Sequence, residues 1–262
     1  MTETKGALVI IGGHEDRDPA GERVILREIA RRVGGGKLVL ATVASGAPDG
    51  YVEEYRAAFA DLGVGELAAF HVKTHDEAMD PACMDVFADA RGVFFTGGDQ
   101  RRITETIVGT PVEDRVRAIY EGGGVIAGTS AGASAMSGEM IERGPSGESP
   151  AEGEIRFAQG LNLLPGVVVD QHFSQRGRMG RLMASVAESP AGIGLGIDEN
   201  TAAVVEGGAF AVIGEGGVTV VVGGELRPAT TARGREVVTI MDARVHLLGA
   251  EDAFDLEQRQ PL

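Results

Sequence analysis

A serine stands between two glycines in the segment Gly128-Thr129-Ser130-Ala131-Gly132, directly after the apolar run Val125 to Ala127. This spacing is typical of a nucleophile elbow, a tight turn from a strand into a helix that exposes the central hydroxyl. The first N–H groups of such a helix lack helical partners and can stabilise an oxyanion. The segment predicts a nucleophilic Ser130 with the Ala131 N–H as an oxyanion donor. In a chain with 40 glycines, a plain strand-to-helix turn is the alternative.

A serine nucleophile needs a base, most often a histidine that a carboxylate orients. Among the five histidines, His172 stands in Asp170-Gln171-His172-Phe173, directly after an apolar run, where it would share a rim with Ser130. His246 is the alternative because α/β-hydrolases place their histidine late in the sequence. The alternation in Arg244 to Leu247 is that of an ordinary strand, so we favour His172.

The orienting acid has two neighbouring candidates, Asp198 and Glu199, which follow the apolar run Gly194 to Ile197. Side chains alternate along a strand, so only one of the pair can point towards the base. The pattern does not decide between them, and Asp170 is a third acid close to His172.

Two further glycine turns follow apolar runs, at Gly12-Gly13 and Gly97-Gly98. In the second turn, Gly98 would supply another oxyanion donor and Asp99 would cap the next helix. His14 follows the first turn and could line the pocket without being the base. A phosphate-binding turn is the alternative at Gly97-Gly98, but that segment has no GxGxxG pattern and no Walker lysine, which argues against a nucleotide site.

Three arginines, Arg176, Arg178 and Arg181, follow the proposed base. Arginines at the start of a helix oppose its dipole, and their planar groups bind carboxylates in a bidentate way. We therefore expect the cluster to recognise an acidic group on a substrate, with a solvated cationic face as the alternative. The same helix would bury one apolar stripe made of Met179, Leu182, Met183 and Val186.

The surrounding elements follow an α/β pattern. Expected buried strands of a parallel sheet, covered by helices on both faces, are Ala7 to Ile11, Leu38 to Val43, Ala68 to Val72, Val93 to Thr96, Val125 to Ala127 and Val167 to Val169. Thr110 to Glu113 has the pattern of a capping box, and Glu142 to Glu154 that of a long surface loop. Residues 192–262 would add antiparallel strands to the sheet's edge, among them Ala202 to Val205, Phe210 to Ile213 and Val218 to Val222. No linker composition divides residues 1–262, so we expect a single domain.

Composition limits the classes of partner. The formal net charge of −15 argues against a general binder of nucleic acid or of an acidic membrane surface. No apolar run approaches the roughly 18 residues of a membrane span. The lone Cys83 has no disulfide partner and no CxxC motif, which suits a cytoplasmic protein with no metal site of that kind.

Four motifs in register make the chain resemble the cyanophycinase family, within a serine peptidase group that also contains aspartyl dipeptidases. They are Gly97 to Gln100, Gly128 to Ala133, Asp170 to Phe173 with the three arginines, and Gly196 to Glu199. The likeness runs from Gly12 to about Glu199. Beyond Gly207 no motif matches, and the segment Glu142 to Phe157 matches only loosely.

The resemblance implies a flavodoxin-like fold related to class I glutamine amidotransferases, a homodimer, and exolytic hydrolysis of cyanophycin, an arginine-bearing polyaspartate, to β-Asp-Arg, without cofactor or metal. It implies Ser130 as nucleophile, His172 as acid and base and Glu199 as orienting acid. It implies a substrate pocket shaped by Gln100, Asp170, Gln171, Arg176, Arg178 and Arg181. The alternatives are an aspartyl dipeptidase acting on short peptides, an esterase of the α/β-hydrolase type, and an inactive relative that binds arginine-rich peptide.

Overall fold

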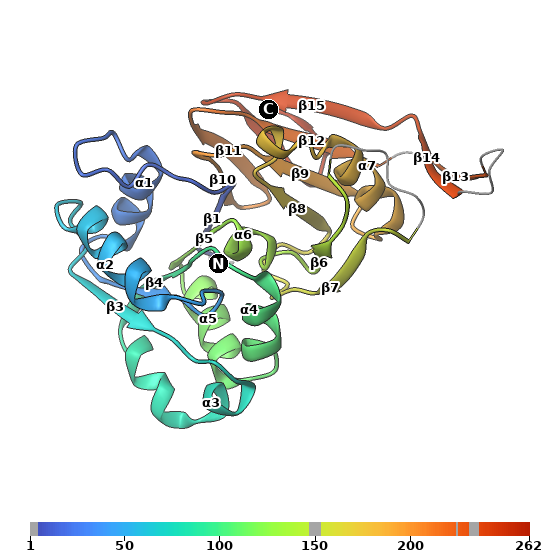
Figure 1. Cartoon of the computed structure of the whole chain (residues 1–262). Helices are drawn as coiled ribbons and strands as arrows, with labels where there is room; N and C mark the ends of the chain where they lie inside the picture. Colours follow the sequence, from blue (N-terminus) through green and yellow to red (C-terminus); the bar gives the residue numbers. More distant parts are fainter. Residues whose placement is uncertain (1–4, 147–152, 224, 231–235) are drawn as a thin grey trace.

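The computed structural model describes residues 5–146, 153–223, 225–230 and 236–262 and contains two main sheets (Figure 1). The larger sheet consists of β1 (Ala7–Ile11), β2 (Lys37–Ala41), β3 (Glu66–Phe70), β4 (Ala90–Phe95), β5 (Val125–Thr129), β10 (Thr201–Glu206), β11 (Ala209–Gly214), β16 (Ala253–Asp255) and β17 (Gln260–Pro261). The second sheet consists of β8 (Val167–Gln171), β9 (Ile193–Ile197), β12 (Val218–Val222) and β15 (Arg244–Leu248). Two separate hairpins pair β6 (Glu139–Arg143) with β7 (Arg156–Gln159) and β13 (Glu225–Thr230) with β14 (Glu236–Met241).

The helices lie between and outside these sheets. They are α1 (Val24–Val33), α2 (Pro48–Phe59), α3 (His75–Met79), α4 (Gln100–Ile107), α5 (Pro111–Glu121), α6 (Ala131–Ser134) and α7 (Met179–Glu188), with short 3₁₀ turns at Pro81–Phe87 and Ser174–Arg176. No helix in the described ranges is long and apolar enough to cross a membrane.

The larger sheet has the order β17-β16-β11-β10-β1-β5-β4-β2-β3. Neighbours from β1 to β3 are parallel, whereas β10 joins β1 antiparallel and β11 continues that edge. The predicted α/β fold with a mostly parallel central sheet and a β-rich C-terminal part is thereby confirmed. The number of domains stays a prediction.

Two predicted strands belong elsewhere. Val167 to Val169 and Val218 to Val222 form β8 and β12, but both lie in the second sheet, in the order β15-β12-β9-β8. The expectation that they join the central sheet is wrong. An apolar run shows that a strand is buried on both faces but does not identify the sheet that holds it.

Alternation along the strands divides the core of the larger sheet into two layers. On one face, Val9 and Leu40 pack with Ile29 of α1 and Phe59 of α2. The opposite face packs against α4, α5 and one face of the second sheet, in a cluster that contains Leu8, Val39, Ile103, Val116, Leu195 and Val220. On the outer face of the second sheet, Leu182 and Val186 of α7 pack with Val221. The second sheet therefore packs with one face against the larger sheet and with the other against α7.

Two local expectations are wrong. Thr110 precedes α5 without forming a capping box, because its hydroxyl donates to the Ile107 carbonyl at 2.6 Å. Met179 is exposed at the first residue of α7 rather than part of the buried stripe. The expected loop Glu142 to Glu154 is confirmed for its described residues after Arg143, the end of β6, while its residues 147–152 lie outside the described residues. Asp99 does cap α4, as predicted, by accepting the N–H of Arg101 at 3.0 Å.

Candidate active site

Ser130 lies in the turn between β5 and α6 with φ 52° and ψ −104°. This positive φ is unfavourable for a residue with a side chain and requires support from its surroundings. The Ser130 N–H donates to the Ile11 carbonyl at 3.0 Å. Glycines on either side allow the close packing: a Cβ at Gly128 would meet the backbone of Gly132, and a Cβ at Gly132 would overlap the Phe95 carbonyl. Tight packing against β1 and β4 thus holds the serine at the strand end.

His172 follows β8 and bridges the serine to a carboxylate. Its Nε2 lies 2.9 Å from Ser130 Oγ, and its Nδ1 lies 2.6 Å from Glu199 Oε1. Its backbone N–H donates to the Gly12 carbonyl at 2.8 Å, and its ring fills the space that a Cβ on Gly13 would occupy. Burial lowers the pKa of His172, while the hydrogen bond to Glu199 opposes that shift. The lowered pKa favours the neutral ring, which is the form that can accept a proton.

The structure separates the two neighbouring acids that the sequence left open. Glu199 faces His172, with 30% of its side chain exposed. The Asp198 carboxylate turns away and accepts the N–H groups of Ser174 at 2.9 Å and Gly217 at 3.1 Å. Asp198 therefore holds the turns beside the site, and Glu199 contacts the histidine.

The two residues predicted to donate to an oxyanion lie beside the serine. Ala131 is the first residue of α6, so its N–H has no partner within that helix. Gly98 adopts φ 143° and lines the hollows on both sides of Ser130. A Cβ there would overlap the Ala44 carbonyl, so the turn accepts only glycine without moving.

A pocket of about 300 Å³ opens on one side of Ser130. All the residues predicted to shape a substrate pocket line it: Gln100, Asp170, Gln171, Arg176, Arg178 and Arg181. Gln100 Nε2 donates to the carbonyls of Ile141 and Glu142 at 3.1 and 2.9 Å, which fixes β6 as one wall. Gln171 Oε1 lies 3.4 Å from Ser130 Oγ.

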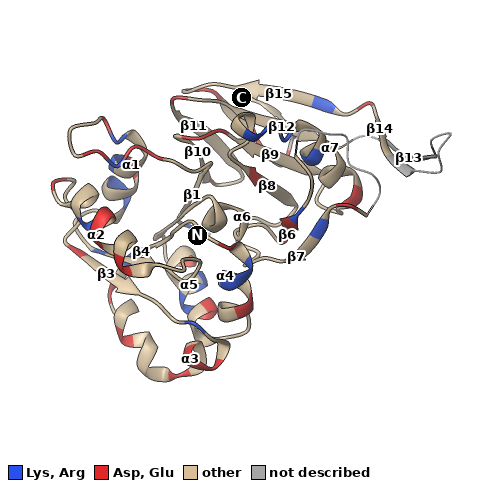
Figure 2. Ribbon diagram, viewed as in Figure 1, with Lys and Arg blue, Asp and Glu red and all other residues tan. Residues whose placement is uncertain are grey.

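Asp170 forms a buried charged cluster with two of the arginines. The Asp170 side chain is only 1% exposed. Its carboxylate accepts hydrogen bonds from Arg181 Nε at 2.7 Å and from Arg178 Nη1 at 3.1 Å. Arg181 Nη2 donates to the same carboxylate. Burial lowers the pKa of Arg178 to about 10, and Asp170 opposes that shift. One carboxylate between two guanidinium groups leaves a positive charge, and the exposed Arg176 adds to it. Figure 2 shows basic residues on β7 and α7 in this region, in contrast to the acidic α3.

A smaller hollow of about 120 Å³ lies beside Ser130 and His172, and its lining includes His14, which was expected only to line the pocket, and Glu15, to which the sequence analysis gave no role. Glu15, 3% exposed, accepts the hydroxyls of Tyr55 and Thr129. His14 stands edge-on to His172 with ring centroids 5.3 Å apart. The only sequence signal for both was their position after the Gly12-Gly13 turn.

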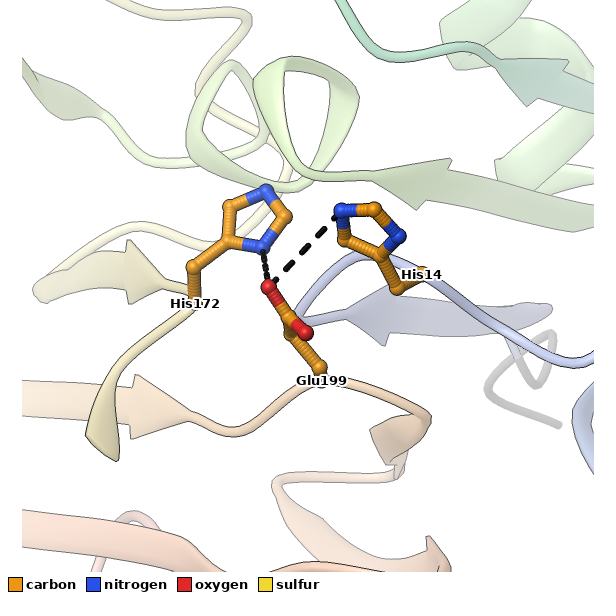
Figure 3. Close-up of side chains that lie close together, drawn as sticks. All are labelled: His14, His172 and Glu199. Atoms are coloured by element: carbon orange, nitrogen blue, oxygen red, sulfur yellow. Dashed lines mark hydrogen bonds and ion pairs between the residues drawn. The ribbon is translucent and has the colours of Figure 1, made fainter. Parts of the chain in front are cut away.

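The rival base is not part of this site. His246 lies in β15, opposite Val220 in the register, and its ring packs beside Phe254. In the part of the chain that the structure describes, one group of three potential metal ligands occurs, formed by His14, His172 and Glu199 (Figure 3).

Comparison with known proteins places the chain in a family. A model of peptidase family S51 matches residues 8–213. The chain is 37% identical over 265 residues to the cyanophycinase of Trichormus variabilis, covering 99% of this chain and 88% of that protein. It is 32% identical over 264 residues to the cyanophycinase of Geminocystis herdmanii, covering 98% and 96%.

A solved structure agrees with the fold. The crystal structure of a peptidase from an acI-B1 actinobacterium superposes with a TM-score of 0.71 at 19% identity, covering 97% of this chain and 98% of that one. The family resemblance inferred from the four motifs is confirmed by the family model and the full-length relatives. This chain belongs to peptidase family S51 and is a hydrolase of the serine peptidase type.

Proposed function

We propose that this chain hydrolyses cyanophycin and releases β-Asp-Arg dipeptides from the end of the polymer. The observation that carries the proposal is the hydrogen-bonded row Ser130, His172 and Glu199 beside an arginine-lined pocket. Relatives that match nearly the whole chain at 32 and 37% identity are cyanophycinases, which supports the same substrate.

In the proposed mechanism, Ser130 acts from a nucleophile elbow, and its Oγ attacks the scissile carbonyl carbon of the substrate. The hydroxyl proton of Ser130 passes to His172 Nε2. Glu199 accepts the Nδ1–H, which keeps the lone pair on Nε2 and stabilises the imidazolium that forms. The N–H groups of Gly98 and Ala131 would receive the oxyanion. His172 then gives its proton to the leaving amine, and a water activated by the same ring releases the acyl group.

The charges of the pocket suit a substrate rich in carboxylates. Arg176 is exposed at the rim and available for a bidentate pair with a backbone carboxylate of the polymer. Asp170 would not bind the substrate directly but would orient Arg178 and Arg181, because its oxygens already accept hydrogen bonds from both guanidinium groups. The aligned guanidinium groups then supply the positive field that binds the acidic end of the chain.

Digestion of purified cyanophycin with mass analysis of the products tests this function. We expect a product with the mass of β-Asp-Arg, no turnover by Ser130→Ala or His172→Ala, and normal turnover by the matched variant His246→Ala. Activity on Asp-Xaa dipeptides with none on the polymer would instead show an aspartyl dipeptidase. Loss of activity in His246→Ala alone would point to an α/β-hydrolase.

A homodimer and a cytoplasmic location are part of the same proposal. The dimer follows from the family resemblance, and light scattering of the purified chain tests it. The cytoplasmic location rests on the lone Cys83, which lies partly buried with its thiol towards the Ala78 carbonyl.

A further inference from the structure

Three metal-ligating side chains converge on the side of His172 that faces away from Ser130. We propose that His14, His172 and Glu199 form an inhibitory zinc site, in which a Zn²⁺ ion binds His14 Nε2, His172 Nδ1 and the Glu199 carboxylate and stops hydrolysis. The inhibition rests on the proposed role of His172 as the base, whereas the binding does not.

The distances suit a small ion. Glu199 Oε1 lies 2.6 Å from His172 Nδ1 and 3.8 Å from His14 Nε2, and the three ligand atoms lie within 4.8 Å of one another. Tetrahedral zinc with bonds of about 2.0 to 2.1 Å separates its ligands by about 3.3 Å. Entry of the ion therefore requires His172 and Glu199 to part by roughly 0.7 Å and His14 to move closer to Glu199 by roughly 0.5 Å. Figure 3 shows that the nearer ring nitrogens of both histidines face the carboxylate.

The two imidazoles are held in place before any ion arrives. His14 adopts φ 49° after the Gly12-Gly13 turn that follows β1, and its ring packs edge-on against His172 at an interplanar angle of 69°. His172 is fixed through its N–H to the Gly12 carbonyl. Because the His14 side chain is 67% exposed, its nitrogen can be reached by a hydrated ion. A preformed set of ligands on rigid strand ends lowers the cost of ordering them on binding.

The donor types favour zinc over other abundant cations. Two imidazole nitrogens and one carboxylate oxygen form a His₂Glu set, which leaves a fourth position for water, as in many zinc sites. Magnesium and calcium prefer all-oxygen ligands and would gain little from the two rings.

Zinc at this position would block the base through its tautomer. As a base, His172 carries its proton on Nδ1 and its lone pair on Nε2, 2.9 Å from Ser130 Oγ. A metal bond to Nδ1 needs the lone pair there, so the proton moves to Nε2 and faces the serine. His172 can then no longer accept the serine proton, and Glu199 is occupied by the ion.

The test combines zinc binding and zinc inhibition, with His14→Gln as the central variant. His14 has no step in the proposed mechanism but contacts His172 and Glu199, so inhibition by zinc is measured for each variant relative to its own activity in EDTA. We expect zinc to inhibit the parent reversibly, with EDTA restoring activity. His14→Gln should require at least about tenfold more zinc for the same inhibition, because loss of even an indirect metal partner lowers metal affinity 10- to 100-fold. His75→Gln is the matched control, because it removes an exposed histidine beside Asp76 and Glu77.

Calorimetry in the Ser130→Ala background keeps the inference testable if cyanophycin is not the substrate. We expect Ser130→Ala to bind one zinc ion, and addition of His14→Gln to weaken that binding about tenfold or more. The inference is overturned if Ser130→Ala binds no zinc, if His14→Gln leaves affinity or inhibition unchanged, or if His75→Gln is the variant that removes them. Failure to digest cyanophycin would overturn only the proposed substrate.

Discussion

The replacement Glu199→Gln tests whether this carboxylate orients the base. Glu199 Oε1 lies 2.6 Å from His172 Nδ1, and the histidine side chain is 6% exposed. The new amide keeps the length of the side chain and removes its charge. It can present either its oxygen or its nitrogen to the ring, and the two orientations impair catalysis in different ways.

With the amide nitrogen towards Nδ1, the ring takes the tautomer whose Nε2–H faces Ser130. A tautomer change of this kind in a catalytic triad lowers kcat about 10⁴-fold. With the amide oxygen towards Nδ1, the tautomer survives but the imidazolium loses its counter-charge. At about 4 Å and an effective dielectric constant of about 20, that attraction is worth about 4 kcal/mol. At about 1.4 kcal/mol per decade, this is a loss of about 10³-fold.

We therefore expect kcat on cyanophycin to fall about 10³- to 10⁴-fold in Glu199→Gln, measured by release of β-Asp-Arg in the presence of EDTA. Asp198→Asn is the matched control, because Asp198 binds the N–H groups of Ser174 and Gly217 rather than the base. It should lower the free energy of unfolding by about 1 to 2 kcal/mol and leave kcat within about tenfold. The orienting role is refuted if Glu199→Gln retains kcat within about tenfold, or if Asp198→Asn is the more damaging change to kcat.

Three further predictions concern pH, the charged cluster and the oxyanion donors. Because burial lowers the pKa of His172 and catalysis needs its neutral form, kcat/KM should rise with pH through a midpoint below 6.5, and a midpoint above 6.5 would contradict this. Asp170→Ala should lower the free energy of unfolding by about 3 to 5 kcal/mol in urea titrations, since it leaves Arg178 and Arg181 buried without their carboxylate. A loss under about 1 kcal/mol would show that solvent compensates the arginines. Gly98→Ala should lower kcat about 10²- to 10³-fold by moving an oxyanion donor, and normal kcat in a folded variant would exclude that N–H from the site.

The glycine pattern and the strand ends carried most of the information in the sequence. Ser130 and His172 each follow a buried apolar run, and the ends of such runs lie at a common edge in α/β folds. The structure brings these two side chains to hydrogen-bonding distance. Their catalytic roles remain predictions that the variants above test.

Other features depended on long-range geometry. The turn between β9 and β10, where Asn200 adopts φ 48°, determines which of the two acids faces the base, Asp198 or Glu199. Alternation describes regular strands and fails in such a turn. The three arginines looked equivalent in sequence, but only Arg178 and Arg181 are buried against Asp170, because they flank the first turn of α7 while Arg176 stays outside it.

The row of three side chains spans both sheets, which no local pattern could show. Ser130 follows β5 in the larger sheet, His172 follows β8 in the second sheet, and Glu199 lies where the chain crosses from β9 back to β10. The Gly12-Gly13 turn joins these parts. The Gly12 N–H donates to the Thr201 carbonyl at 3.0 Å, the Gly12 carbonyl accepts from His172, and the Gly13 carbonyl accepts from Asn200, each at 2.8 Å. The distance between serine and base is therefore set by how the two sheets pack, and this turn determines the geometry of the site because it holds the His172 backbone and packs against the His172 ring at Gly13.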